Sequence, residues 1–196
     1  MVAGRFDAAK FAAARITPAR TKQDDKIAAL NTEAGKLLDA GKFDEALAKA
    51  DELQRAIPPD ETLRHSKTDM LRAAILAGKG DIDGALARLA AFARANPDNG
   101  SVQYTVLLHI LRDGAYKNKR AAALPYATRI VALHGESPTT NMILAEAEYA
   151  AGNKDAAIVV LEKIAKNPDL PDKAFETTVS LALAAVKADK PWPTDK

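Results

Sequence analysis

The chain has 196 residues, of which 47% are hydrophobic, 28% are charged and none is cysteine. Its 28 basic and 26 acidic side chains are interspersed and leave a net charge of +2, so the basic stripe typical of nucleic-acid-binding domains is missing. Without cysteine there is neither a disulfide framework nor a thiol nucleophile, and because no apolar run approaches about 18 residues, the sequence predicts no membrane span.

The N-terminal segment, residues 1–20, is expected to be a helix and linker, with an alanine-rich helix at about residues 7–15. A longer helix over residues 22–40 follows, because an apolar residue recurs at every third or fourth position. Thr21 has a side chain suited to cap its start, and Gly41 stands where a left-handed residue ends a helix.

Asp44 is expected to cap the next helix, which ends at Pro58 because the residue before a proline disfavours helical geometry. The chain then repeats this helix–turn–helix arrangement, with Asp60 as the expected cap of the second unit. The third unit has a turn that is longer by about four residues, and Pro125 falls in the first turn of its second helix, where proline is tolerated. The predicted units cover residues 22–59, 60–97, 99–137 and 138–168, a capping helix covers 171–188, and a flexible tail covers 190–196.

One pattern recurs along the chain at a spacing of 34 to 39 residues. An alanine is followed by apolar or small residues one, four and seven positions later, beginning at Ala46, Ala85, Ala123 and Ala157. Such residues lie on one face of a helix, and a period of this length is typical of arrays of helix pairs. The sequence therefore predicts an all-α solenoid of about four antiparallel helix pairs, with an N-terminal helix and a C-terminal capping helix.

The turn of the first unit, residues 40–47, closely resembles that of a tetratricopeptide repeat. That family has a small residue on its first helix, a glycine at the turn, an aromatic or apolar residue soon after, an alanine on its second helix and a proline at the end. The corresponding residues are Ala34, Gly41, Phe43, Ala46 and Pro58 in the first unit, Ala73, Gly80, Ile82, Ala85 and Pro97 in the second, and Ala145, Gly152, Ala157 and Pro168 in the fourth. The third unit departs from the pattern, with Leu107 in place of the small residue. The resemblance covers residues 24–168 and implies a right-handed superhelix that binds a protein or peptide segment.

Residues 2–7 are similar to the end of a thioredoxin-like domain in bacterial proteins that carry helical repeats after it. This second resemblance implies an alternative function, as the C-terminal repeat module of a larger exported thiol-disulfide oxidoreductase, and a periplasmic rather than a cytoplasmic location. The same stretch also matches the turn of the repeat, since residues 4–7 parallel residues 41–44. Both interpretations stay open.

No set of residues predicts catalysis or a metal site. The three histidines, His65, His109 and His134, lack a metal-ligating spacing, and the carboxylates fall at turns and helix starts, where capping accounts for them. A helical enzyme that uses His109 is the least supported alternative. The basic turn of residues 117–120 either contacts an anionic partner or lies in solvent. We therefore expect a non-enzymatic scaffold for a protein or peptide partner, with no cofactor, catalytic residue, nucleic acid or membrane.

In a tetratricopeptide array the first helix of each pair lines the concave face. Counting positions from the small residue places a rather apolar set of side chains there: Asn31, Met70, Tyr104, Leu108, Met142, Glu146 and Tyr149. Methionine and tyrosine suit adaptable peptide binding, and the alternative that several of these residues are core stays open. Trp192, the only tryptophan, is expected to pack against the last helix, to pack in the groove or to be disordered.

Overall fold

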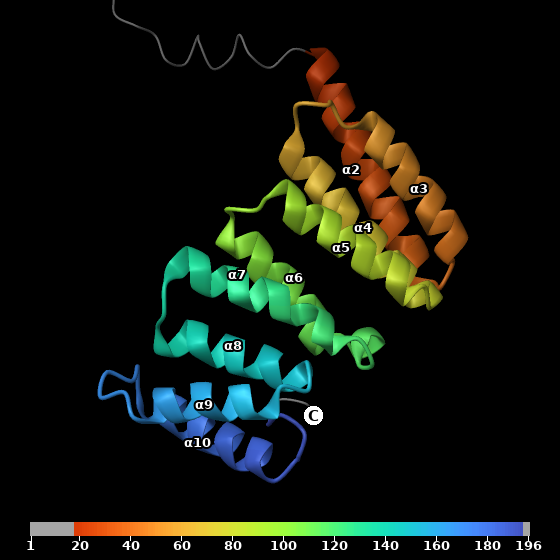
Figure 1. The fold of residues 1–196 in the computed structure, drawn as a ribbon. Coiled ribbons are helices and arrows are strands. Elements are labelled where there is room, and N and C mark those ends of the chain that lie inside the picture. Colours follow the sequence, from red (N-terminus) through yellow and green to blue (C-terminus); the bar gives the residue numbers. More distant parts are fainter. Residues whose placement is uncertain (1–17, 194–196) are drawn as a thin grey trace, which may run out of the picture. The chain divides into compact units, whose positions relative to one another are not determined.

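The computed structural model describes residues 18–193 (Figure 1), and all regular structure in this range is helical. The prediction of an all-α chain is therefore confirmed for these residues. None of their helices is long and apolar enough to cross a membrane. The helix expected at residues 7–15 and the thioredoxin-like stretch at residues 2–7 lie outside the described range. The helices are α2 (Pro18–Asp39), α3 (Phe43–Ala56), α4 (Thr62–Lys79), α5 (Ile82–Ala95), α6 (Gly100–Arg112), α7 (Leu124–His134), α8 (Pro138–Ala150), α9 (Lys154–Ala165) and α10 (Lys173–Lys187), with the 3₁₀ helices η1 (Gly114–Tyr116) and η2 (Arg120–Ala123).

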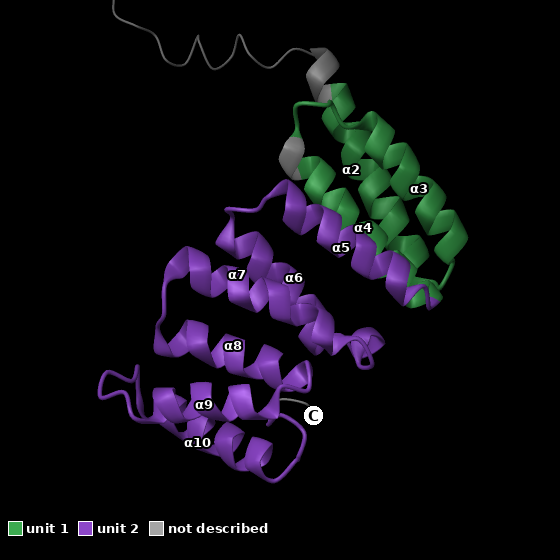
Figure 2. Cartoon of the chain, in the orientation of Figure 1, with its two compact units in different colours: residues 1–79 green, residues 80–196 purple. Residues whose placement is uncertain are grey.

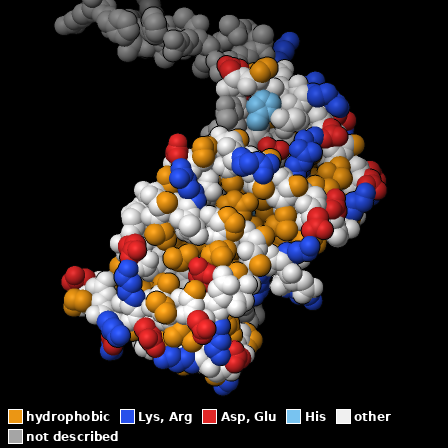
Figure 3. All heavy atoms as spheres, viewed as in Figure 1, with side chains coloured by type: hydrophobic (Ala, Val, Ile, Leu, Met, Phe, Trp, Pro, Cys, Tyr) orange, Lys and Arg blue, Asp and Glu red, His pale blue; other side chains and the backbone are white. Residues whose placement is uncertain are grey.

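The chain divides into two compact units between Lys79 and Gly80 (Figure 2). Unit 1 contains α2, α3 and α4, and unit 2 contains α5 to α10. The boundary falls inside the helix pair predicted over residues 60–97. On the face drawn in Figure 3, cationic and anionic side chains are interspersed in both units and neither sign forms a continuous stripe.

Unit 1 is built around α3, which packs against both α2 and α4. Ile27 and Leu30 of α2 meet Leu53 of α3 in one buried cluster. Ala34 of α2 and Ala46 of α3 have no exposed surface, as a close approach of these two helices requires. Small side chains therefore occupy the contact near the turn, and the cluster of Ile27, Leu30 and Leu53 lies farther from it.

The turn between α2 and α3 ends the first helix as the sequence predicts. Gly41 has a φ of +71°, a left-handed conformation that glycine adopts without steric cost. The Gly41 N–H donates to the Leu38 carbonyl (3.0 Å), and the Lys42 N–H donates to the Leu37 carbonyl (2.9 Å). This pair of bonds is the Schellman motif, which satisfies carbonyls at the end of a helix.

Two glycines of unit 1 provide a matched stability test. Gly35 lies inside α2 with open space where a Cβ atom would stand, whereas Gly41 requires positive φ. We expect Gly41→Ala to lower the free energy of unfolding by about 1 kcal/mol and Gly35→Ala to raise it by about 0.5–1 kcal/mol. Urea titrations followed by circular dichroism measure both changes. Effects of the same sign would contradict the helix ends described above.

The predicted caps of unit 1 are wrong. Thr21 lies inside α2, because the helix already begins at Pro18, a residue whose fixed φ suits a first helical turn. Asp44 lies in the first turn of α3 and forms an ion pair with Lys79. The turn between the two helices consists of Ala40, Gly41 and Lys42 only, and Lys42 is the N-cap of α3. The helix therefore begins before Asp44 can act as a cap.

The predicted cap of α4 is also wrong. The helix begins at Thr62 rather than directly after Asp60. The carbonyl of Glu61 accepts hydrogen bonds from the backbone N–H groups of Arg64 (3.0 Å) and His65 (3.2 Å). The Glu61 N–H in turn donates to the Pro58 carbonyl (3.0 Å), so a turn at the prolines delays the start of the helix by one residue.

In unit 2 each helix packs against the next one along the chain, from α5 to α10. Four of these helices have an N-cap residue whose side chain accepts a hydrogen bond from the helix backbone. The caps are Asp81, Asn99, Ser137 and Asp172, all of residue types that are preferred at this position. Pro125 lies in the first turn of α7, as predicted. The last helices and the tail share one buried cluster, formed by Ala145, Ala157, Leu161, Ile164, Val179, Ala182, Val186 and Trp192.

Candidate functional site

An extended turn joins α6 to α7 in unit 2, where the sequence predicts one, and runs over residues 113–123 through η1 and η2. We call this segment the long turn. The Asp113 side chain accepts a hydrogen bond from the Ala115 N–H (2.9 Å), and Tyr116 is only 2% exposed. Burial, with a smaller contribution from the charge of Asp113, raises the pKa of the Tyr116 phenol. A buried aromatic side chain thus anchors the turn, in which Ala123 is also buried and residues 113–115 and 117–119 are exposed.

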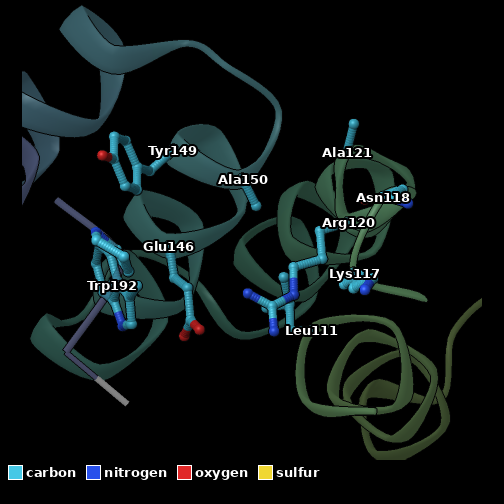
Figure 4. Close-up of a pocket in the computed structure, with 10 residues that line it drawn as sticks. Leu111, Lys117, Asn118, Arg120, Ala121, Glu146, Tyr149, Ala150 and Trp192 are labelled. Carbon is cyan, nitrogen blue, oxygen red and sulfur yellow. The ribbon is translucent and has the colours of Figure 1, made fainter. Parts of the chain in front are cut away.

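A pocket of about 370 Å³ lies between the long turn, α8 and the C-terminal tail (Figure 4). Figure 4 shows Arg120 on one side of this space, facing Glu146 and Trp192 on the other. We call it the unit 2 pocket. It is lined by Leu111, Lys117, Asn118, Arg120, Ala121, Glu146, Tyr149, Ala150, Pro191 and Trp192.

The charged groups of the pocket have distinct surroundings. The Glu146 residue is 9% exposed, and both of its carboxylate oxygens accept hydrogen bonds from the Arg112 guanidinium, with 2.7 Å between Oε2 and Nη2. This two-point contact joins α6 to α8. The basic residues of the lining are Lys117 and Arg120, and its acidic residue is Glu146.

The basic turn of residues 117–120 does not act as one patch. Lys117 and Arg120 line the unit 2 pocket, whereas the Lys119 ammonium lies 2.8 Å from the carboxylate of Asp83 on α5. Asn118 lines the pocket as well. The two interpretations open from the sequence, a solvated turn and a contact with an anionic partner, therefore apply to different residues of the turn.

Two aromatic side chains form the wall opposite the long turn. The ring centroids of Tyr149 and Trp192 lie 6.4 Å apart with an interplanar angle of 39°, a separation at which aromatic pairs attract one another. The Tyr149 hydroxyl donates to the backbone carbonyl of Lys190 (2.8 Å). Trp192 is 5% exposed and belongs to the same buried cluster as Val186 of α10. The indole thus packs against both α8 and the last helix.

The seven predicted partner-binding residues do not gather at one place. Asn31 and Met70 belong to unit 1, where Asn31 is exposed and Met70 is half-buried. Asn31 borders a separate pocket of about 250 Å³ whose apolar lining includes Ile27, Leu53 and Ile57. These two residues therefore have no described relation to the unit 2 pocket.

Only two of the five predicted residues in unit 2 line its pocket. They are Glu146 and Tyr149. Tyr104 is 42% exposed on α6, and Leu108 borders a shallow depression on the same helix that also includes His109 and Arg112. Met142 packs against the buried cluster of the last helices, which agrees with the alternative that some of these residues are core.

Sequence reasoning missed most of the pocket. Arg120 and Lys117 were visible as part of a basic turn, and the extra length of that turn was the available signal. A position of Trp192 in a groove was one of three alternatives left open by the sequence. No sequence pattern predicted that Leu111 lines a pocket. Within the described residues, no group of three or more histidine and carboxylate side chains is placed to hold a metal ion.

No protein-family model, curated protein or solved structure matches this chain. The resemblance to tetratricopeptide repeats therefore depends on the residues of the chain itself, and the function has to be argued from the geometry of its units.

Proposed function

We propose that this chain is a non-enzymatic scaffold of the tetratricopeptide kind, a right-handed solenoid of antiparallel helix pairs that binds a peptide or protein segment. The packing of each unit 2 helix on the next one along the chain supports this proposal, because repeat arrays are built from neighbour contacts. The glycine-stopped turn after α2, and its equivalent at Gly152 after α8, also supports it.

The observation that carries the binding proposal is the composition of the unit 2 pocket. Lys117 and Arg120 supply positive charge on one side, and Tyr149 and Trp192 supply aromatic surface on the other. Binding sites commonly combine an apolar wall with a small number of placed polar groups. This combination suits a segment that presents an apolar side chain together with an acidic group or a backbone carbonyl.

Two lysines of the long turn allow a matched test. Lys117→Gln and Lys119→Gln remove the same charge two positions apart, but only Lys117 lines the pocket, while Lys119 pairs with Asp83. In pull-downs from the source cells with quantified recovery, we expect Lys117→Gln to reduce recovery of the specific partner about two- to tenfold, the range for the loss of one typical hydrogen bond. Lys119→Gln is expected to behave as the wild type.

The pattern of losses distinguishes three outcomes. Equal losses for the two lysine variants would mean that partners respond to overall charge rather than to the pocket. No loss for Lys117→Gln, combined with a loss for Tyr104→Ala, would move the binding surface to the exposed face of α6 that the sequence predicts. Retention of all partners by the three variants would contradict binding at either place.

A further inference from the structure

We propose that residues Lys190–Pro193 act as a tethered ligand of the apolar surface of α8, α9 and α10 in which Trp192 is buried, beside the unit 2 pocket. We call this surface the indole seat and infer that it accepts extended segments in which an aromatic side chain stands between prolines. This inference rests on the proposed function and names its ligand class. It also makes the tail a competitor that an incoming segment must displace.

A built turn directs the tail from α10 back to α8. Asp189 adopts a φ of +53°, which is uncommon for a residue other than glycine. The Lys190 N–H donates to the Ala185 carbonyl (2.9 Å). The Lys154 ammonium of α9 contacts the Asp189 carboxylate (2.7 Å) and donates to the Lys187 carbonyl (3.3 Å). The reversal visible after α10 in Figure 1 is thus held by specific bonds.

The tail is held in the way that a groove holds a peptide. One side-chain donor, the Tyr149 hydroxyl, binds a backbone carbonyl of the tail at Lys190. One large side chain, Trp192, is removed from solvent in the buried cluster that also contains Ala145 and Leu161. A backbone contact for affinity and a side-chain seat for specificity are the usual elements of peptide recognition.

The chemistry of the segment makes this contact exchangeable. Pro191 and Pro193 have no N–H group to donate, and among the described residues no backbone–backbone hydrogen bond involves positions 191–193. Prolines fix φ, so such a segment loses little conformational entropy when it is bound in an extended form. The tail therefore depends on the indole and on the Tyr149 bond, and a free segment with the same features makes the same contacts.

The test uses the full chain and a fluorescein-labelled peptide with the sequence of residues 190–193, followed by fluorescence anisotropy. Trp192→Ala empties the indole seat. Lys154→Met loosens the turn and changes no residue that lines the pocket. Lys163→Met, on the same helix but at a residue that pairs with Glu136, is its control. A short tether gives an effective concentration of the order of millimolar. We therefore expect the peptide to bind Trp192→Ala about tenfold more tightly than the wild type.

Lys154→Met is expected to improve peptide binding about two- to fivefold, which corresponds to the loss of one exposed ion pair, whereas Lys163→Met matches the wild type. Because Trp192 is the only tryptophan, its emission should also shift to longer wavelength in Lys154→Met as the tail spends more time in solvent. The same peptide with alanine in place of its tryptophan should not bind.

Equal peptide affinity for the wild type and a folded Trp192→Ala variant would overturn the inference, as would tight binding of the alanine peptide. If circular dichroism shows that Trp192→Ala is unfolded, the Lys154→Met and Lys163→Met pair decides by itself. If the peptide affinities contradict the inference but Lys117→Gln selectively loses the partner in the pull-down, the tethered ligand is refuted and the proposed function is retained. If the peptide experiment gives the expected affinities but Lys117→Gln retains the partner, the tethered ligand is supported and a role of the basic side of the pocket in partner binding is refuted.

Discussion

Ala46→Leu is expected to lower the free energy of unfolding of the chain by about 1–3 kcal/mol, the usual cost of forcing a larger side chain into a packed core. Ala46 of α3 and Ala34 of α2 have no exposed surface, and α2 and α3 pack directly against each other. A leucine at this place has no space unless the helices separate. Ala157→Leu repeats the test in unit 2, where Ala145 and Ala157 are equally buried between α8 and α9.

Each variant has a control on its own helix. Ala48 of α3 and Ala156 of α9 are exposed, so Ala48→Leu and Ala156→Leu are expected to change the free energy of unfolding by no more than about 0.5 kcal/mol. Urea titrations followed by circular dichroism at 222 nm provide all four values. If a buried and an exposed alanine on one helix gave the same change, the assignment of the small residue to the helix contact would be wrong.

The helices were predictable because their signals are local. The bounds of α5, Ile82–Ala95, follow from apolar spacing before a proline, and the end of α2 follows from the glycine at position 41. The caps at Thr21, Asp44 and Asp60 were not predictable in the same way. Any short polar residue near a helix start resembles a cap. Which residue acts as the cap depends on the position at which the preceding turn ends and the helix begins.

The pocket was only partly predictable, because its walls come from distant parts of the chain. The long turn was predictable from its extra length and its charged residues. Its position beside Glu146 and Trp192 depends on the order in which α7 and α8 pack, and on the turn at Asp189 that reverses the tail. A repeat pattern describes neighbouring helices, so it contains no information about a tail that folds back across them.

Glu146→Leu is expected to lower the free energy of unfolding by about 1–3 kcal/mol. Breaking a fully buried ion pair costs roughly 3–5 kcal/mol, because the remaining charge loses its compensation. Here the Glu146 side chain is 11% exposed but the Arg112 side chain is 38% exposed, so water recovers part of that cost. The single variant places an apolar side chain beside the Arg112 guanidinium at the contact between α6 and α8.

The double variant Arg112→Met/Glu146→Leu separates this explanation from a loss of packing. Replacing both members of a buried pair by apolar residues is often nearly neutral, so the double variant should be more stable than Glu146→Leu alone. The exposed pair of Lys163 and Glu136, with side chains 60% and 59% exposed, serves as the control, and Glu136→Gln should have a much smaller effect. Urea titrations followed by circular dichroism and by Trp192 emission measure each variant. Additive losses in the double variant would show that Glu146 and Arg112 stabilise unit 2 independently of their pairing.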